Sequence, residues 1–231
     1  MQRTLKRILA LLLASFMLFA FAGCSDEDLG EQWGAPGEGE TVDNGMNETI
    51  GNAPTLDTGA DETPAGDGNG KILIVYFSNS GNTHKLTGMI ESQIEADVLR
   101  LIPADPYEWE TLFDRAKDEL DQGIRPELTD LPEAEVIAQY DTILVGFPIW
   151  WYDLPMPMWT FLEAYDLSGK TIIPYFTHNG SSSGAASIST IEKLCPNSTV
   201  KNDDYLSISG NSVDGSEDKV KSWLAEIGLV K

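Results

Sequence analysis

The chain has 231 residues, of which 37 are acidic and 15 are basic, so its formal net charge at neutral pH is -22. Such an acidic balance repels phosphate backbones and argues against nucleic acid as a partner. Two cysteines in a chain of this length exclude a disulfide-dense scaffold, so a hydrophobic core must supply the stability.

Residues 1–23 are predicted to be the signal peptide of a bacterial lipoprotein. Three basic side chains among the first seven residues precede an apolar stretch over residues 8–21, which is short for a membrane-spanning helix of about 20 residues. The sequence Phe21-Ala22-Gly23 before Cys24 resembles a lipobox, where a precursor is cleaved and the cysteine acylated. We therefore expect an extracytoplasmic protein, attached to the bacterial cell membrane only through a lipid on Cys24. An ordinary secretory signal is the alternative.

Residues 24–70 are predicted to be the lipidated cysteine followed by an acidic, disordered linker. From Ser25 to Gly70 the chain has twelve acidic side chains, no basic one and no apolar periodicity. Such a segment cannot bury enough apolar surface to offset the entropy cost of ordering. As a flexible tether it would span roughly 35–40 Å. The predicted folded domain is residues 71–231, with 25 acidic and 12 basic side chains and a formal charge of -13.

Within residues 71–231, apolar runs typical of strands alternate with amphipathic helical segments. The predicted strands cover residues 72–77, 98–102, 142–147, 171–176 and 205–209, and the predicted helices cover residues 86–94, 109–120, 158–165, 188–195 and 220–227. This alternation predicts an α/β fold, a three-layer sandwich around a five-stranded parallel sheet. Pro174 falls inside the fourth strand, where its missing N–H predicts a bulge or a local break.

The first candidate binding loop follows the first strand. Ligands of such sheets bind beyond the carboxyl ends of the strands. The loop Ser78-Asn79-Ser80-Gly81-Asn82-Thr83 carries hydroxyl groups and a glycine but no charged side chain. At the start of a helix, these hydroxyls and the free backbone amides suit a phosphate group. The spacing fits neither a P-loop nor the three-glycine dinucleotide motif. A simple helix cap is the alternative interpretation.

Two further loops follow the third and fourth strands. Pro148-Ile149-Trp150-Trp151-Tyr152 has three adjacent aromatic residues that cannot all face a core, which predicts a planar partner, with packing against the next helix as the alternative. Thr177-His178-Asn179-Gly180 suits hydrogen bonds to the polar edge of a heteroaromatic ring, or forms a flexible loop before a helix cap. No cluster of cysteines or carboxylates accompanies the two histidines, so no metal site is predicted.

In this order, the three loops resemble those of the flavodoxin family. The stretch from Ser78 to Thr83 is similar to the family's Thr/Ser-x-Thr/Ser-Gly-Asn-Thr phosphate loop. The loop around Trp150 is similar to its aromatic flavin-flanking loop, and Thr177 to Gly180 stands where its second flavin loop lies. The stretch from Gly123 to Leu128 also resembles a subgroup of small, sometimes lipid-anchored flavodoxin-like proteins. The resemblance covers residues 71–231 and implies strand order 2-1-3-4-5 and non-covalent binding of FMN.

The resemblance also implies roles for individual residues. The first loop would bind the phosphate through its hydroxyls, Asn82 and its backbone amides. Trp150 would stack on the flavin ring, Trp151 or Tyr152 would shield another edge, and backbone groups of the second and third loops would hydrogen-bond the ring. The implied cofactor-binding residues are Ser78, Asn79, Ser80, Gly81, Asn82, Thr83, Pro148, Ile149, Trp150, Trp151, Thr177, His178, Asn179 and Gly180. No catalytic side chain is assigned. A protonated His178 near the ring would raise the flavin's reduction potential, whereas an acidic surround would lower it.

Three functions remain open at this point. The main prediction is an electron carrier that docks with redox protein partners through its acidic surface, because charge complementarity gives fast and transient encounters. The second is an FMN-dependent oxidoreductase that reduces quinones or similar small acceptors with NAD(P)H. The third is a flavin-free binding lipoprotein with the same fold. Fold alone does not decide among them.

Overall fold

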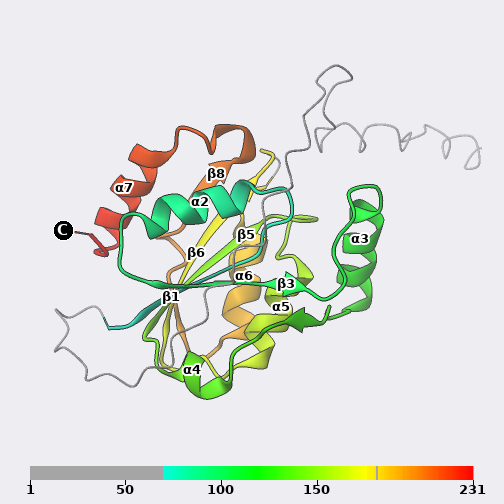
Figure 1. Cartoon of the computed structure of the whole chain (residues 1–231), viewed down its shortest axis with the longest axis horizontal. Helices are drawn as coiled ribbons and strands as arrows, with labels where there is room; N and C mark the ends of the chain where they lie inside the picture. The colour runs from blue at the N-terminus through cyan, green and yellow to red at the C-terminus, as the bar shows by residue number, and fades with distance from the viewer. Residues whose placement is uncertain (1–69, 181, 231) are drawn as a thin grey trace, which may run out of the picture. The chain divides into compact units, whose positions relative to one another are not determined.

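The computed structural model describes residues 70–180 and 182–230. The predicted signal peptide, Cys24 and nearly all of the predicted linker lie outside the described residues. A parallel sheet forms the centre of the described part (Figure 1). Its strands are β1 (Ile72–Tyr76), β2 (Asp97–Arg100), β5 (Thr142–Pro148), β6 (Thr171–His178), β7 (Thr199–Val200) and β8 (Leu206–Ser209). Their order is β2-β1-β5-β6, and β7 and β8 both pair with the outer side of β6. This arrangement confirms the predicted strand order 2-1-3-4-5. Two short strands share the fifth position.

Pro174 does not interrupt the strand that contains it. The pairing of β5 with β6 runs without a break from Thr142↔Thr171 to Pro148↔Thr177. On the other side of β6, the pairing with β7 ends at Ile172 and the pairing with β8 begins at Tyr175. Backbone groups of even-numbered residues face that outer side, since the carbonyl of Ile172 accepts from the N–H of Lys201 at 2.8 Å. The proline therefore lies in the gap between two outer strands. The predicted bulge is absent, and the predicted local break occurs in the pairing on this outer side only.

The second predicted strand is split in two. β2 stays in the main sheet, whereas β3 (Ile102–Pro103) leaves it and pairs with β4 (Leu128–Thr129) in a separate antiparallel sheet. The chain between them carries α3 (Leu112–Gln122). This helix was predicted to begin at Trp109, but Trp109 precedes it and is 48% exposed. The short helix α4 (Ala134–Ala138) was not predicted.

Helices cover both faces of the sheet (Figure 1). α2 (Asn82–Glu91) and α7 (Glu217–Glu226) pack together on one face, and α5 (Met156–Ala164) and α6 (Ala185–Leu194) pack on the other. The core under α2 includes Leu86 and Ile90, which are fully buried against strand residues. Burial of each such side chain contributes about 1.5–3 kcal/mol. The three-layer prediction is confirmed.

The ends of the helices follow from local chemistry. Gly81 before α2 and Gly123 after α3 adopt left-handed φ values of 89° and 65°, which cost a glycine little. Pro157 lies in the first turn of α5, where a missing N–H removes no helical bond. Among the described residues, no helix is both long and apolar enough to cross a membrane.

Candidate functional site

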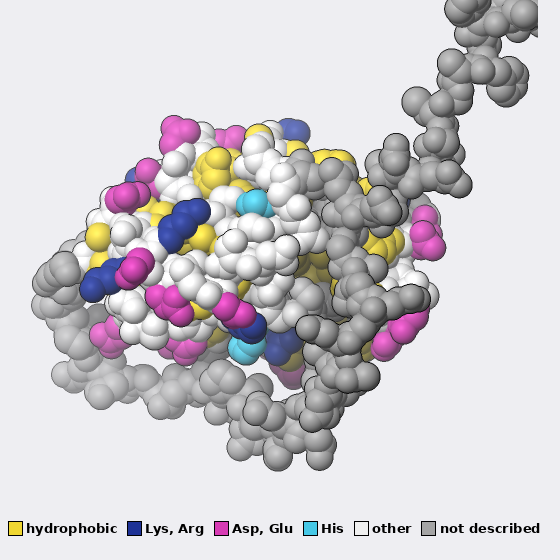
Figure 2. Space-filling model, turned by 90° about the horizontal axis from the view of Figure 1, so that it is seen from above, with side chains coloured by type: hydrophobic (Ala, Val, Ile, Leu, Met, Phe, Trp, Pro, Cys, Tyr) yellow, Lys and Arg dark blue, Asp and Glu magenta, His cyan; other side chains and the backbone are white. Residues whose placement is uncertain are grey.

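The three predicted binding loops leave the sheet at the same edge. In the parallel register, Tyr76 pairs with Gly146, and Gly146 pairs with Tyr175. Further along, Pro148 pairs with Thr177, and Thr177 pairs with Ile208. Because neighbouring strands end together, the loops after β1, β5, β6 and β8 lie side by side. In Figure 2, acidic side chains are spread around the margin of the visible face, whose middle is mostly uncharged.

The first loop combines a buried hydroxyl with the start of a ten-residue helix. Ser78 is only 6% exposed, and its Oγ atom has no hydrogen-bond partner among the described residues. Gly81 precedes α2 in a left-handed conformation, and the first turn of that helix contains no acidic side chain. A buried hydroxyl without a partner costs about 1–3 kcal/mol. This local arrangement therefore favours an acceptor supplied from outside the chain, and a phosphate at a helix N-terminus is such an acceptor.

Thr177 joins the three loops. Its Oγ1 atom lies 2.9 Å from Oγ1 of Thr83, and both side chains are buried. Its carbonyl accepts a hydrogen bond from the backbone N–H of Ile149 at 2.9 Å. One residue of the third loop thus contacts the first loop through its side chain and the second through its backbone.

The second loop is a tight two-residue turn with unusual residues. Trp150 and Asp153 exchange two backbone hydrogen bonds of 3.1 and 2.9 Å. Between them, Trp151 and Tyr152 adopt positive φ values of 47° and 67°. Turns of this kind usually contain Asn and Gly, and a left-handed conformation costs other residues roughly 1–2 kcal/mol each. The turn is stabilised from outside, since the indole N–H of Trp151 donates to the carbonyl of Phe113 at 3.1 Å.

The third loop is ordered by its histidine. Nδ1 of His178 accepts the backbone N–H of Gly180 at 2.8 Å, and Gly180 has a φ of 93°. Burial, and secondarily the positive charge of Lys219, lowers the pKa of His178 below its ordinary value. At neutral pH the ring is therefore uncharged with Nδ1 as an acceptor, so the raised potential considered for a protonated His178 does not apply there.

Comparison with known proteins identifies the family. The sequence model of a family described as Flavodoxin matches residues 71–227. A candidate flavoprotein from Bacteroides eggerthii DSM 20697 is 30% identical, with a TM-score of 0.58 over 71% of this chain and 100% of that chain. A candidate flavoprotein from Bacteroides uniformis ATCC 8492 is also 30% identical, with a TM-score of 0.58 over 68% of this chain and 99% of that one. The chain belongs to the flavodoxin family.

Two further comparisons complete this result. A flavoprotein from Lactobacillus acidophilus NCFM, solved in complex with FMN, is 24% identical over 63% of this chain and 97% of that chain, and its TM-score of 0.50 shows the same fold. No match was found among curated proteins. Membership of the flavodoxin family confirms the prediction of FMN as the cofactor.

The flavodoxin's aromatic loop differs from the predicted arrangement at Trp150. This side chain is only 8% exposed, and its ring packs edge-to-face with Phe77 and Tyr107 at centroid distances of 5.2 and 5.0 Å. The predicted stacking of Trp150 on the flavin is therefore not supported. Trp151 is half-buried, and Tyr152, at the tip of the turn, is 51% exposed and is the most exposed aromatic side chain of this loop.

Tyr107, which packs against Trp150, is held in place by hydrogen bonds and an ion pair. The hydroxyl of Tyr107 donates to Oε2 of the buried Glu119 at 2.5 Å, and Nε of Arg115 donates to Oε1 at 2.9 Å. The guanidinium also lies 4.1 Å from the centre of the Tyr107 ring. Burial, together with the hydrogen bond to Glu119, raises the pKa of Tyr107 far above its ordinary value. The network keeps Tyr107 neutral and fixes the aromatic layer under the turn.

The remaining predicted residues fall into three groups by exposure. Thr83, Ile149 and Thr177 are buried, and Asn79, Asn82, Pro148 and His178 are half-buried at the edge; Ser80, Asn179 and Gly180 are exposed there. Sequence analysis missed the turn after β8, which reaches the same edge. β8, the strand before this turn, is short and alternates buried and half-buried residues. Its sequence therefore lacks the continuous apolar run that marks β1, β5 and β6.

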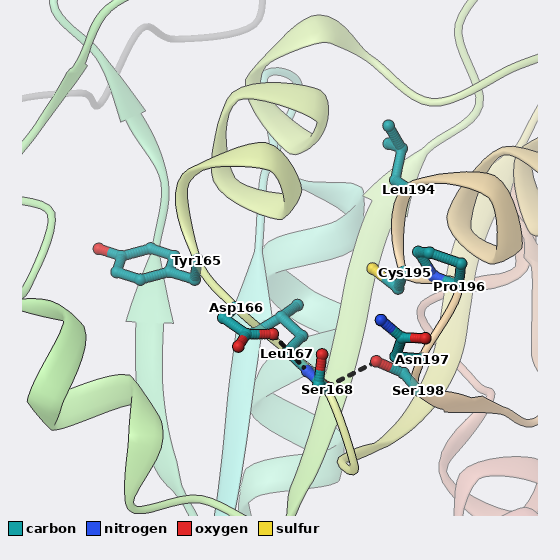
Figure 3. A pocket seen from close by; sticks show the side chains of 9 residues that line it. All are labelled: Tyr165, Asp166, Leu167, Ser168, Leu194, Cys195, Pro196, Asn197 and Ser198. Carbon is teal, nitrogen blue, oxygen red and sulfur yellow. Dashed lines mark hydrogen bonds between the residues drawn. The ribbon is translucent and has the colours of Figure 1, made fainter.

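A separate pocket of about 120 Å³ lies at the opposite, amino-terminal end of the sheet (Figure 3). Residues 165–168 and 194–198 form it, before β6 and before β7. Cys195 lines this pocket, and burial raises the pKa of its thiol to about 11, so the thiol stays protonated at neutral pH. Across the part of the chain that the structure describes, no group of three potential ligand residues is placed to hold a metal ion.

Proposed function

We propose that this flavodoxin is an electron carrier that docks with redox protein partners. It binds FMN at the edge of the sheet where the loops after β1, β5, β6 and β8 lie side by side. The buried, unpartnered hydroxyl of Ser78 at the start of α2 supports the FMN site most directly. It provides a donor for a phosphate oxygen, and the open backbone at Gly81 leaves room for close approach, since nothing lies within 4 Å of its missing Cβ.

The chain's own residues would bind and orient the cofactor. The amides and hydroxyls of the first loop would hold the phosphate, and Tyr152 would cover the ring in place of Trp150. Thr177 fixes the distance between these two regions, since it bonds both to Thr83 and to Ile149. When bound, FMN supplies the exchange of one or two electrons, which the protein side chains do not supply by themselves.

The hydrogen bonds of one acidic residue in the second loop favour an electron carrier over an enzyme in which that residue donates or accepts a proton. Asp153 is the acidic residue at the base of the aromatic turn. Its carboxylate accepts the backbone N–H of Leu154 at 2.7 Å and the hydroxyl of Thr190 at 3.0 Å. One carboxylate oxygen therefore stabilises the backbone after the turn, and the other connects the turn to α6. The surrounding acidic surface would attract a positively charged partner, which accelerates transient encounters.

The first experiment is an absorbance titration of the purified chain with FMN, followed by NADH and then NADPH under argon. Retained flavin that neither nucleotide bleaches is the result expected of a carrier that needs a protein partner. Rapid bleaching that a quinone reverses would instead make the protein an FMN-dependent oxidoreductase. Failure to retain any FMN would overturn the proposal and leave a flavin-free binding lipoprotein.

The proposal includes attachment to the bacterial cell membrane by a lipid on Cys24, with the folded part outside the cytoplasm. The sequence before Cys24 supports this part of the proposal. Expression of the full chain in a bacterium should place it in the membrane fraction, with an acyl label incorporated. Cys24→Ser should abolish the label, and a wild-type chain without label would contradict the anchor.

A further inference from the structure

The turn after β8 brings a glycine against two predicted FMN residues. β8 pairs with β6 in parallel, and Ser209 lies opposite His178. The short 3₁₀ turn η2 (Gly210–Ser212) follows β8. A Cβ atom added at Gly210 would lie 2.8 Å from Nδ2 of Asn82 and 3.5 Å from Oδ1 of Asn179. The φ of Gly210 is not left-handed. Its backbone therefore accepts alanine, and the nearest atoms that the added methyl group would meet belong to the neighbouring side-chain amides.

The turn is fixed in place from both sides. Nζ of Lys85, one turn into α2, lies 2.9 Å from the carboxylate of Asp214. Val213 is buried in the core under α7. Nζ of Lys219 donates to the carbonyl of Ser207 at 2.7 Å. An atom added at Gly210 would therefore move the amide of Asn82, which is the flexible partner, and leave the turn where it is.

The two amides come from different loops and remain available. Asn82 opens α2 in the first loop, and Asn179 belongs to the third loop. Within residues 70–180 and 182–230, neither side-chain amide hydrogen-bonds another protein group. Together they form a polar pair between the region proposed for the phosphate and the region proposed for the ring. Amide groups both donate and accept, as the hydroxyls of a sugar-alcohol chain do.

We propose that Gly210 is a positioning residue that sets Asn82 and Asn179 to bind the hydroxylated chain linking the phosphate to the flavin ring. This inference rests on the proposed FMN site. It predicts that the amide pair recognises the ribityl chain, which FMN and riboflavin share and lumiflavin lacks. The inference thus assigns the Asn82 side chain to the ribityl chain in place of the phosphate contact that the family resemblance implied for it. The phosphate contact at Ser78 is separate, since only FMN has that group.

The test compares three flavins on purified variants. Gly210→Ala should weaken FMN and riboflavin alike, by roughly fivefold to tenfold in Kd for the loss of one hydrogen bond. Lumiflavin affinity should not change. Gly88→Ala is the matched control, because Gly88 is exposed on α2 with nothing within 4 Å of its missing Cβ, and it should bind all three flavins as the wild type does.

A double-mutant cycle with Asn82→Ala tests the mechanism. Asn82→Ala creates no clash and should show the same loss, while Gly210→Ala in the Asn82→Ala background should add nothing. An additive double variant, or equal weakening of lumiflavin, would overturn the positioning role and indicate a general distortion of the loops. Unchanged FMN affinity in Gly210→Ala would also overturn it while leaving the FMN site intact. A wild-type chain that binds no flavin would instead overturn the proposed function.

Discussion

The two ends of the parallel sheet use polar groups in opposite ways. At the amino-terminal end, the pocket in Figure 3 has a mixed apolar and polar lining, and several of its polar groups bond to the chain itself. The carboxylate of Asp166 accepts the N–H of Ser168 at 3.0 Å, and the hydroxyl of Ser198 donates to the carbonyl of Leu167 at 2.6 Å. Next to this pocket, the buried Lys170 donates to the carbonyls of Ala138 and Tyr140.

The carboxyl-terminal end keeps part of its polar capacity free. Ser78 has a buried hydroxyl without a partner among the described residues, and the side-chain amides of Asn82 and Asn179 both lie close to Gly210. Unused hydrogen-bonding capacity points to the ligand site here because it coincides with the edge where the three predicted loops meet. Substitutions at the two ends should consequently separate stability from flavin binding.

The largest effect is expected from Lys170→Met at the amino-terminal end. The ammonium group donates to two carbonyls at 3.0 and 2.5 Å and is only 8% exposed. Its removal leaves the buried carbonyl of Tyr140 and the part-buried carbonyl of Ala138 short of a donor, at a cost of about 2–3 kcal/mol in the free energy of unfolding. Urea denaturation would measure this loss. The Kd for FMN should stay unchanged, and a parallel loss of FMN affinity would contradict the separation of the two ends.

Thr177→Val should affect both properties. It preserves the shape of the side chain but removes the hydroxyl that lies 2.9 Å from Thr83, leaving a buried Oγ1 without its partner. We expect a loss of about 1–2 kcal/mol in the free energy of unfolding. FMN affinity should fall as well, because the first and third loops lose their direct connection. Calorimetry of the apoprotein and a fluorescence titration would measure the two effects. Weaker FMN binding without loss of stability would mean that Thr177 contacts the cofactor instead of joining the loops.

Ser78→Ala should reduce binding alone. The buried hydroxyl has no protein partner to lose, so the apoprotein should be as stable as the wild type or slightly more stable. The Kd for FMN should rise by roughly fivefold to tenfold, which corresponds to about 1–1.4 kcal/mol.

Ser187→Ala is the matched control for this substitution. The Ser187 hydroxyl is likewise buried without a partner among the described residues, but it lies in α6 on the other face of the sheet. This variant should show the same stability and an unchanged FMN affinity. Equal affinities for Ser78→Ala and the wild type would show that the phosphate is not bound at Ser78.

Much of the fold was predictable because the strands are continuous apolar runs. β1, β5 and β6 lie within one residue of the predicted starts, and their loops appear in the predicted places. The sequence did not show which of three adjacent aromatics would be exposed. That depends on the left-handed turn at Trp151 and Tyr152, which reverses the chain direction after Trp150. It depends as well on Tyr107, about forty residues earlier, which covers Trp150.

Two other features of the site depend on tertiary contacts that carry no local pattern. Thr83 and Thr177 bond to each other across 94 residues of sequence. Gly210 follows a short strand and contacts Asn82 and Asn179 only after β8 has paired with β6. Residue type alone indicated a phosphate and a planar ring, because glycine, hydroxyl and aromatic residues have direct chemical preferences. The positioning residues have no such chemical signature and require the packed structure.

The smallest effect concerns pH and the third loop. The pKa of His178 is lowered in the folded state, mainly by burial, so the unfolded chain binds a proton first as the pH falls. Above the unfolded pKa of about 6.5, the histidine is neutral in both states and contributes no pH dependence. As the pH falls below that value, the folded state loses stability, because a doubly protonated ring cannot accept the N–H of Gly180.

His178→Asn isolates this contribution, because an asparagine oxygen can accept the same N–H and does not titrate. The difference in unfolding free energy between the wild type and this variant should be flat above pH 6.5. At lower pH it should shift slightly against the wild type. Subtracting the two curves removes the titration of the many carboxylates. If FMN affinity follows the same difference curve, the His178–Gly180 bond sets the third loop for binding at the carboxyl-terminal end. A difference curve that stays flat at all pH values would mean that this bond contributes nothing to the ordering of the loop.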